Sequence, residues 1–95
     1  MVEGKASISE KDFERIMKAL ANRRRLAILR FLKTMKEASV GDIAEEIKLS
    51  FKATSKHLGV LSAAGVVDRE QRSLQMFYCL APNSPLPARS VISLL

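Results

Sequence analysis

SVGDIAEEIKLSFKATSKHLGVLSAAG, residues 39–65, decides the fold because it holds two amphipathic patterns separated by a very short turn. After Ser39, apolar side chains recur at positions 40, 43, 44 and 47, which predicts a short helix over residues 40–47. Ser50 is a favourable N-cap, and a second helical pattern runs from it to Gly65, a residue type common just past a helix end. Two helices joined so closely indicate a helix-turn-helix.

Two further amphipathic patterns precede this pair. Ser9 opens a helix expected over about residues 10–21, and Asn22 is the expected cap of a second helix. The small, polar and charged residues 1–8 are expected to form a disordered tail.

The pattern changes after Gly65. Apolar and aromatic residues then alternate up to Leu80, which indicates two strands joined near residues 71–73. Three prolines follow, and residues 88–95 could form a short final helix. The expected fold is therefore mainly α with a β-hairpin wing, in the order ααααββ(α).

This order predicts one winged helix-turn-helix domain over residues 9–81, expected to bind DNA. Residues 82–95 are expected to form a proline-rich turn and a short dimerisation helix.

The distribution of charge favours a polyanionic partner. The chain has 16 Lys and Arg against 10 Asp and Glu, a formal net charge of +6. Between Glu46 and Asp68 it contains no acidic residue but does contain Lys48, Lys52 and Lys56. Because a carboxylate would repel a phosphate backbone, this carboxylate-free stretch, residues 47–67, predicts a nucleic-acid-binding surface.

The helix expected after Ser50 has two contrasting faces. The face expected to meet the core consists of Phe51, Thr54, Leu58 and Leu61. The face expected to meet DNA consists of Lys52, Ser55, Lys56 and Gly59. Any solvated surface helix also turns Lys and Ser outward, so this face alone does not indicate DNA binding. It does so only together with the adjoining short helix, the carboxylate-free stretch and the hairpin.

Several other functions are not expected from this composition. One Cys and one His cannot supply a disulfide framework or a structural zinc site, so we expect neither metal nor cofactor. Ser55 and His57 lie two positions apart on a helix and face different ways, so they cannot form a nucleophile–base pair, and we expect no catalysis. No apolar run is long enough to span a membrane and no signal peptide is evident, which predicts a cytoplasmic protein.

Three stretches carry a resemblance to a known family: MKALANRRRLAILRFL (17–32), LSFKATSKHLGVLSAAGVV (49–67) and FYCL (77–80). Together they make residues 16–80 resemble the arsenic-repressor (ArsR) family of winged-helix transcription regulators. The resemblance implies a homodimeric regulator, with repression as the expected direction. It would bind a palindromic site in double-stranded DNA, with one recognition helix from each subunit in successive major grooves.

The DNA-binding residues expected from this resemblance and from the charge pattern are Ser50, Phe51, Lys52, Ser55, Lys56, Arg69 and Arg72. Ser50 would offer a helix N-terminus to a phosphate, and Phe51 would touch a thymine methyl group. Arg69 and Arg72 lie on the expected wing, where they would meet phosphates or the minor groove.

The chain departs from the metal-sensing members of the family. Those proteins carry a Cys-x-Cys run where residues 37–42 here contain no thiol, and residues 88–95 lack the His and carboxylate ligands of the other known sites. The stretch Arg23–Arg24 also replaces the usual Pro-Thr pair; it could meet phosphate, but a solvated or salt-bridged helix end is the favoured interpretation.

The apolar tail predicts where two subunits meet, because such residues are too apolar to leave in water. The expected interface residues are Phe13, Ile16 and Met17 on the first helix, and Val91, Ile92, Leu94 and Leu95 in the tail. The alternative to DNA binding is a winged-helix module that binds another protein. The carboxylate-free stretch argues against that alternative.

Overall fold

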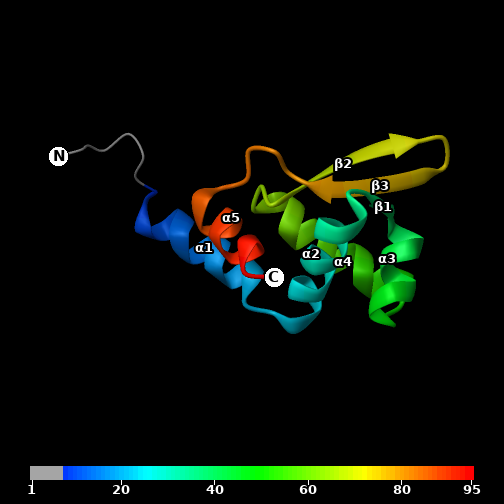
Figure 1. The fold of residues 1–95 in the computed structure, drawn as a ribbon, viewed down its shortest axis with the longest axis horizontal. Coiled ribbons are helices and arrows are strands. Elements are labelled where there is room, and N and C mark those ends of the chain that lie inside the picture. Colours follow the sequence, from blue (N-terminus) through cyan, green and yellow to red (C-terminus); the bar gives the residue numbers. More distant parts are fainter. Residues whose placement is uncertain (1–7) are drawn as a thin grey trace.

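Five helices and a small three-stranded sheet make up the fold in a computed structural model that describes residues 8–95 (Figure 1). The elements are α1 (Glu10–Leu20), α2 (Arg23–Met35), β1 (Ala38–Ser39), α3 (Val40–Ile47), α4 (Phe51–Ala63), β2 (Val67–Arg72), β3 (Gln75–Leu80) and α5 (Leu86–Ser93). The predicted winged helix-turn-helix is confirmed. Of the expected disordered tail, residues 1–7 lie outside the described part of the chain.

Side-chain caps start the first four helices where the sequence predicts. Each cap oxygen accepts a 3.1 Å hydrogen bond from the backbone N–H three residues later: Ser9 from Asp12, Asn22 from Arg25, Ser39 from Asp42 and Ser50 from Ala53. These bonds satisfy backbone donors that have no partner inside the helix. Lys48, in a left-handed conformation, ends α3 and allows the sharp turn into α4.

One hydrophobic core lies between the helices and one face of the sheet. Its fully buried side chains are Ile28, Leu29, Leu32, Ile43, Thr54, Leu58, Leu61, Val66 and Val67. Each large apolar side chain buried here contributes about 1.5–3 kcal/mol relative to exposure. Because α2, α3, α4 and the hairpin all contribute to this core, the helix-turn-helix and the wing are held to one another.

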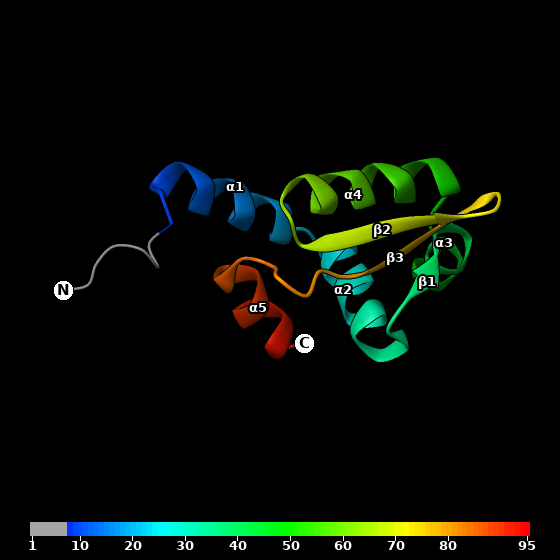
Figure 2. The same cartoon turned by 90° about the horizontal axis from the view of Figure 1, so that it is seen from above.

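The sheet is antiparallel with strand order β1-β3-β2, so β3 is central. Ala38 pairs with Tyr78, and Val67 pairs with Leu80. The sequence predicted only the hairpin, because β1 is two residues long and too short for an alternating pattern. Figure 2 shows the hairpin running beside α4, with its tip reaching past the start of that helix.

The structure corrects three details of the prediction. The wing turn lies one residue later than expected, at Ser73 and Leu74, so Leu74 is not in a strand and is 96% exposed. Ser73 makes this turn possible by adopting a positive φ of 57° in place of the usual glycine. Phe51, predicted to meet the core, is 63% exposed and lies instead at a small surface hollow beside the wing tip. The last helix begins at Leu86, earlier than predicted.

Two glycines of the helix-turn-helix region should respond oppositely to alanine. Gly65 has φ +76°, which L residues rarely adopt, so Gly65→Ala should lower the free energy of unfolding by about 1–2 kcal/mol. Gly59 lies within α4 with no atom within 4 Å of an added Cβ, so Gly59→Ala should raise it by about 0.5–1 kcal/mol. Urea unfolding of both variants checks the pair. Equal effects in the same direction would contradict the positive φ of Gly65 and the open helical position of Gly59.

Candidate nucleic-acid interface

The exposed face of α4 carries donors and no carboxylate. Lys52, Lys56 and Gly59 are exposed and Ser55 is half-buried, as the helical spacing predicts. Leu58 and Leu61 on the opposite face are fully buried, which fixes the rotation of the helix about its axis. The first turn of α4 contains no acidic residue, so the positive end of the helix dipole at Ser50 is uncompensated.

Phe51 and Leu74 flank a small apolar hollow between the start of α4 and the wing tip. The hollow encloses 130 Å³ and is also lined by Val40 and Met76. Both flanking side chains are well exposed. The start of α4 therefore presents an exposed apolar ring at the position that precedes the exposed Lys52.

The two wing arginines lie on opposite faces of the hairpin. Successive side chains of a strand alternate between faces, and Val67 is buried in the core. Arg69 therefore shares the helix-side face with Tyr78, its partner in the register. Arg72 lies on the outer face with Glu70.

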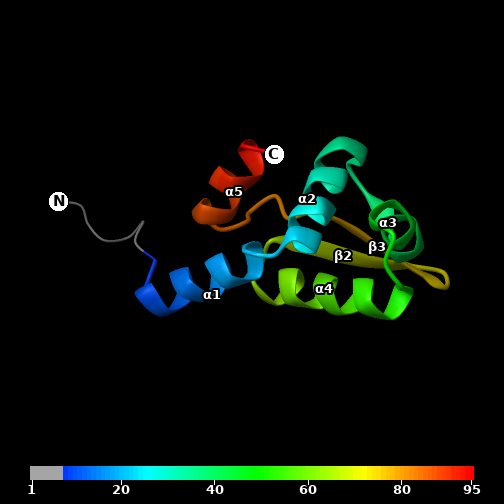
Figure 3. The same ribbon diagram turned by 90° about the horizontal axis from the view of Figure 1, so that it is seen from below.

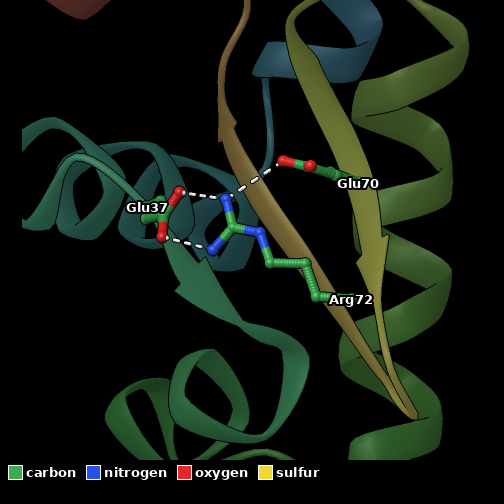
Figure 4. A network of polar contacts seen from close by, with 3 residues as sticks. All are labelled: Glu37, Glu70 and Arg72. Atoms are coloured by element: carbon green, nitrogen blue, oxygen red, sulfur yellow. Dashed lines mark hydrogen bonds and ion pairs between the residues drawn. The ribbon is translucent and has the colours of Figure 1, made fainter.

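Arg72 is held by two carboxylates (Figure 4). Its guanidinium donates to both oxygens of Glu37 at 2.7 and 2.8 Å and to Glu70 at 3.0 Å. It also stacks over the ring of Phe77, 4.6 Å from the centroid. These bonds lower the pKa of the Glu37 carboxyl and raise the pKa of Arg72. No sequence pattern indicates the Glu37 contact, because the two residues are 35 positions apart.

The acidic residues outside α1 gather away from the exposed face of α4. Glu37, Asp42, Glu45 and Glu46 line a hollow of 580 Å³ between the end of α2 and α3. Three residues on or beside the wing, Glu37, Asp68 and Glu70, line a second hollow of 240 Å³. Lys48 also lines the first hollow, and Arg69 and Arg72 line the second. Acidic side chains therefore lie beside basic ones in both hollows, whereas α4 itself has no carboxylate.

Arg25 joins three helices from its place in the first turn of α2. Its guanidinium donates to the carbonyl oxygens of Ala19 at 2.6 Å and Lys18 at 3.2 Å in α1, and contacts Nδ1 of His57 in α4 at 3.1 Å. Because guanidinium is only a donor, Nδ1 must accept, and the proton of neutral His57 lies on Nε2.

The predicted dimer residues divide into three sets by their exposure. Ile16 and Ile92 are buried in the core of a single subunit, so they do not lie on an exposed edge. Val91 and Leu95 are half-buried against that core. Phe13 and Met17 remain exposed on α1, and Leu94 is 85% exposed beside the C-terminus. Figure 3 shows α1 and α5 together at the end of the molecule opposite the wing tip.

The sequence predicts no metal at residues 37–42 and 88–95. Residues 37–42 contain carboxylates but no thiol. Across residues 8–95 no three His, Cys, Asp or Glu side chains are grouped so that they could hold a metal ion. Cys79 lies on the outer face of the sheet, and burial raises the pKa of its thiol, which disfavours the reactive thiolate.

Within the same described range, no helix has the length and apolar character needed to cross a membrane.

A hairpin beside a helix-turn-helix whose second helix exposes lysines defines a winged helix-turn-helix of the nucleic-acid-binding type. The model of the family described as bacterial regulatory protein, arsR family, matches residues 22–69. The chain belongs to this family.

The transcriptional activator HlyU of Vibrio cholerae is 39% identical over 66 residues, which cover 70% of this chain. The match spans 60% of that relative's length. The structure of reduced HlyU from V. cholerae has a TM-score of 0.77 at 34% identity, covering 90% of this chain and 85% of HlyU.

Two other solved structures are similar. The homodimeric winged helix-turn-helix DNA-binding domain of a possible ArsR-family regulator from Mycobacterium bovis has a TM-score of 0.77 at 27% identity, covering 94% of this chain and 84% of that domain. The transcriptional repressor PagR of Bacillus anthracis has a TM-score of 0.73 at 25% identity, covering 88% of this chain and 92% of PagR.

The environment of His57 predicts a loss of stability in mild acid. Burial, together with the positive charges of Arg25, Arg24 and Lys56, lowers the pKa of His57 below its ordinary 6.5. The unfolded chain therefore binds this proton more readily, and stability present above pH 6.5 is lost as the pH falls toward the folded-state pKa. The melting temperature should fall between about pH 7 and pH 5.5.

The matched variant is His57→Gln, whose side-chain oxygen can still accept from Arg25 but does not titrate. Its melting temperature should depend less on pH over that interval. The same pH dependence in both proteins would show that another group is responsible.

Proposed function

We propose that this protein is a sequence-specific, double-stranded DNA-binding transcription regulator that acts as a homodimer in the cytoplasm and not as an enzyme. The observation that carries the proposal is the exposed face of α4. This face offers Lys52, Ser55 and Lys56 without any carboxylate and lies beside a projecting hairpin. Its family membership adds to this support.

In the proposed complex, α4 lies in the major groove. Lys52, Ser55 and Lys56 meet base edges or the phosphates beside them. Ser50 places the N-terminal amides of α4 near a phosphate, where the helix dipole favours negative charge. The exposed ring of Phe51 packs against a thymine methyl group, which only the major groove presents.

The wing adds contacts beside the groove. We assign a phosphate or minor-groove contact to Arg69, which makes no ion pair within the described residues and shares the hairpin face that packs on the helices. Arg72, expected from the sequence to contact DNA in the same way, is engaged by Glu37 and Glu70. It could reach a phosphate only by exchanging these partners.

Dimerisation would use the exposed apolar residues of α1 and the C-terminal segment. Phe13, Met17 and Leu94 would be covered by the same surface of a second subunit, and Val91 and Leu95 would lie at its edge. Such a dimer presents two α4 helices related by a two-fold axis, and a palindromic site matches that symmetry.

Repression is the proposed direction because occupation of promoter DNA alone is sufficient for it. Both signs of regulation occur among the relatives, since HlyU is named an activator and PagR a repressor. The alternative function is a protein-binding module. The acidic hollow between α2 and α3 would be its contact surface, and its binding would depend little on the phosphate contacts of α4.

A triple variant tests the recognition helix. Lys52→Ala/Ser55→Ala/Lys56→Ala should weaken binding to a duplex selected by the wild-type protein by at least about tenfold. It should also reduce the slope of log affinity against log salt by about 0.9 for each phosphate that the variant no longer neutralises. Fluorescence anisotropy at several salt concentrations measures both quantities.

The control is Lys11→Ala/Lys18→Ala on α1, which removes the same charge from a different surface. It should change affinity and slope much less. Equal losses in the two variants, or none in the triple variant, would reject α4 as the recognition helix.

A charge placed in the apolar C-terminal segment should dissociate the dimer. Leu94→Glu would bury a carboxylate in the proposed interface, and the protein should sediment as a monomer at micromolar concentration. Leu74→Glu makes the same change at another highly exposed leucine, on the wing tip, and should leave the dimer intact. A wild-type protein that is monomeric at this concentration would overturn the proposed interface.

A further inference from the structure

The wing packs on the core through Val67 and Tyr78, but near its tip the sheet has only two strands. A two-stranded hairpin is marginally stable in water, and its angle to α4 decides where its tip meets DNA. Backbone pairing with the body of the domain is limited to the register positions of Ala38 and Ser39, opposite Tyr78 and Phe77. The part of β3 nearer the tip has no strand beside it on that edge within residues 8–95.

The Arg72 side chain adds a contact between the two-stranded end of the wing and the body of the domain. It starts from the last residue of β2, crosses β3, and reaches Glu37 immediately before β1 (Figure 4). The guanidinium also stacks over the ring of Phe77 in β3. One side chain thereby links all three strands on the outer face of the sheet. The two bonds to Glu37, at 2.7 and 2.8 Å, form a fork that fixes both direction and distance.

The local charge makes this arginine a poor phosphate ligand. Glu37 and Glu70 together more than neutralise Arg72, so the group as a whole is negative. A phosphate approaching Arg72 would meet both carboxylates at close range, where like charges repel. The alternation along β2 also directs Arg72 away from the hairpin face that carries Arg69.

We infer that the fork between Glu37 and Arg72 is a brace that sets the angle of the wing, and that Arg72 is a positioning residue for DNA binding rather than a DNA contact. The inference rests on the proposed function, because the wing angle matters only if the wing meets DNA. It assigns to Glu37, an acidic residue in a DNA-binding domain, a role in favour of binding.

The decisive variant is Glu37→Gln. A pure charge effect and loss of the brace predict opposite changes in its affinity for DNA. Removing a negative charge from a DNA-binding protein should strengthen binding if only electrostatics acts. Loss of the fork should instead weaken binding by at least about threefold, because the wing contacts then have to be ordered on association. Glu70→Gln is the matched control: it removes the same charge and only one bond, and should leave affinity unchanged or slightly higher.

The salt dependence separates bracing from phosphate contact. Arg72→Ala should weaken binding with little change in the slope of log affinity against log salt, whereas Arg69→Ala should lower that slope by about 0.9. Arg72→Ala and Glu37→Gln combined should cost little more than either alone, because both remove the same fork. The inference is overturned if Glu37→Gln binds as tightly as the wild type or more tightly, or if Arg72→Ala lowers the slope as Arg69→Ala does.

Hydrogen exchange without DNA keeps this inference separate from the proposed function. Amides of residues 71–76 should exchange faster in Glu37→Gln than in the wild type, and Glu70→Gln should show a smaller change. Unchanged exchange in Glu37→Gln would refute the brace whatever the DNA measurements give. Absence of salt-dependent DNA binding by the wild type would refute the proposed function. The hydrogen-exchange result would still show whether Glu37 and Arg72 brace the wing.

Discussion

The burial of one face of α4 is the constraint on which the rest of this structure depends. Thr54, Leu58 and Leu61 are fully enclosed between α3, the hairpin and the other helices. Rotation of α4 about its axis would expose these side chains, at a cost of about 1.5–3 kcal/mol for each leucine. The same burial therefore holds Lys52 and Lys56 outward, so that core packing determines which surface can meet a nucleic acid.

Charge is arranged around this fixed helix. The carboxylate-free stretch, residues 47–67, ends where the wing begins, and the wing keeps its acidic side chains on the face away from the helices. The positive net charge can therefore orient a bound polyanion toward α4. An evenly distributed charge of the same size would attract polyanions without orienting them.

Most of the fold could be predicted because its signals are local. The caps Ser9, Asn22, Ser39 and Ser50 lie within three residues of the amides they satisfy, so their chemistry is visible in the sequence. The features that sequence reasoning missed arise from contacts between distant residues. Strand β1 exists because β3 pairs with it, and a two-residue segment is too short for its sequence to predict that pairing.

The candidate site also combines features that follow from local sequence with features that depend on distant contacts. The donors of α4 follow from helical spacing, and their exposure agrees with it. The exposure of Phe51 beside the wing tip and the pairing of Arg72 with Glu37 both depend on neighbours that are distant in the sequence. Ile16 fits an apolar helix stripe equally well as core or as interface, and only the packing of α1 places it in the core.

Selection of bound sites from randomised duplex DNA tests the central claim most directly, with the full chain as the binding protein. A two-fold symmetric pair of recognition helices predicts enrichment of an inverted repeat whose half-site centres lie about 10 base pairs apart. The enriched half-sites should include thymine near the position of Phe51. Recovery of sequences with no common motif would contradict sequence-specific binding by α4, and with it the function proposed for this domain.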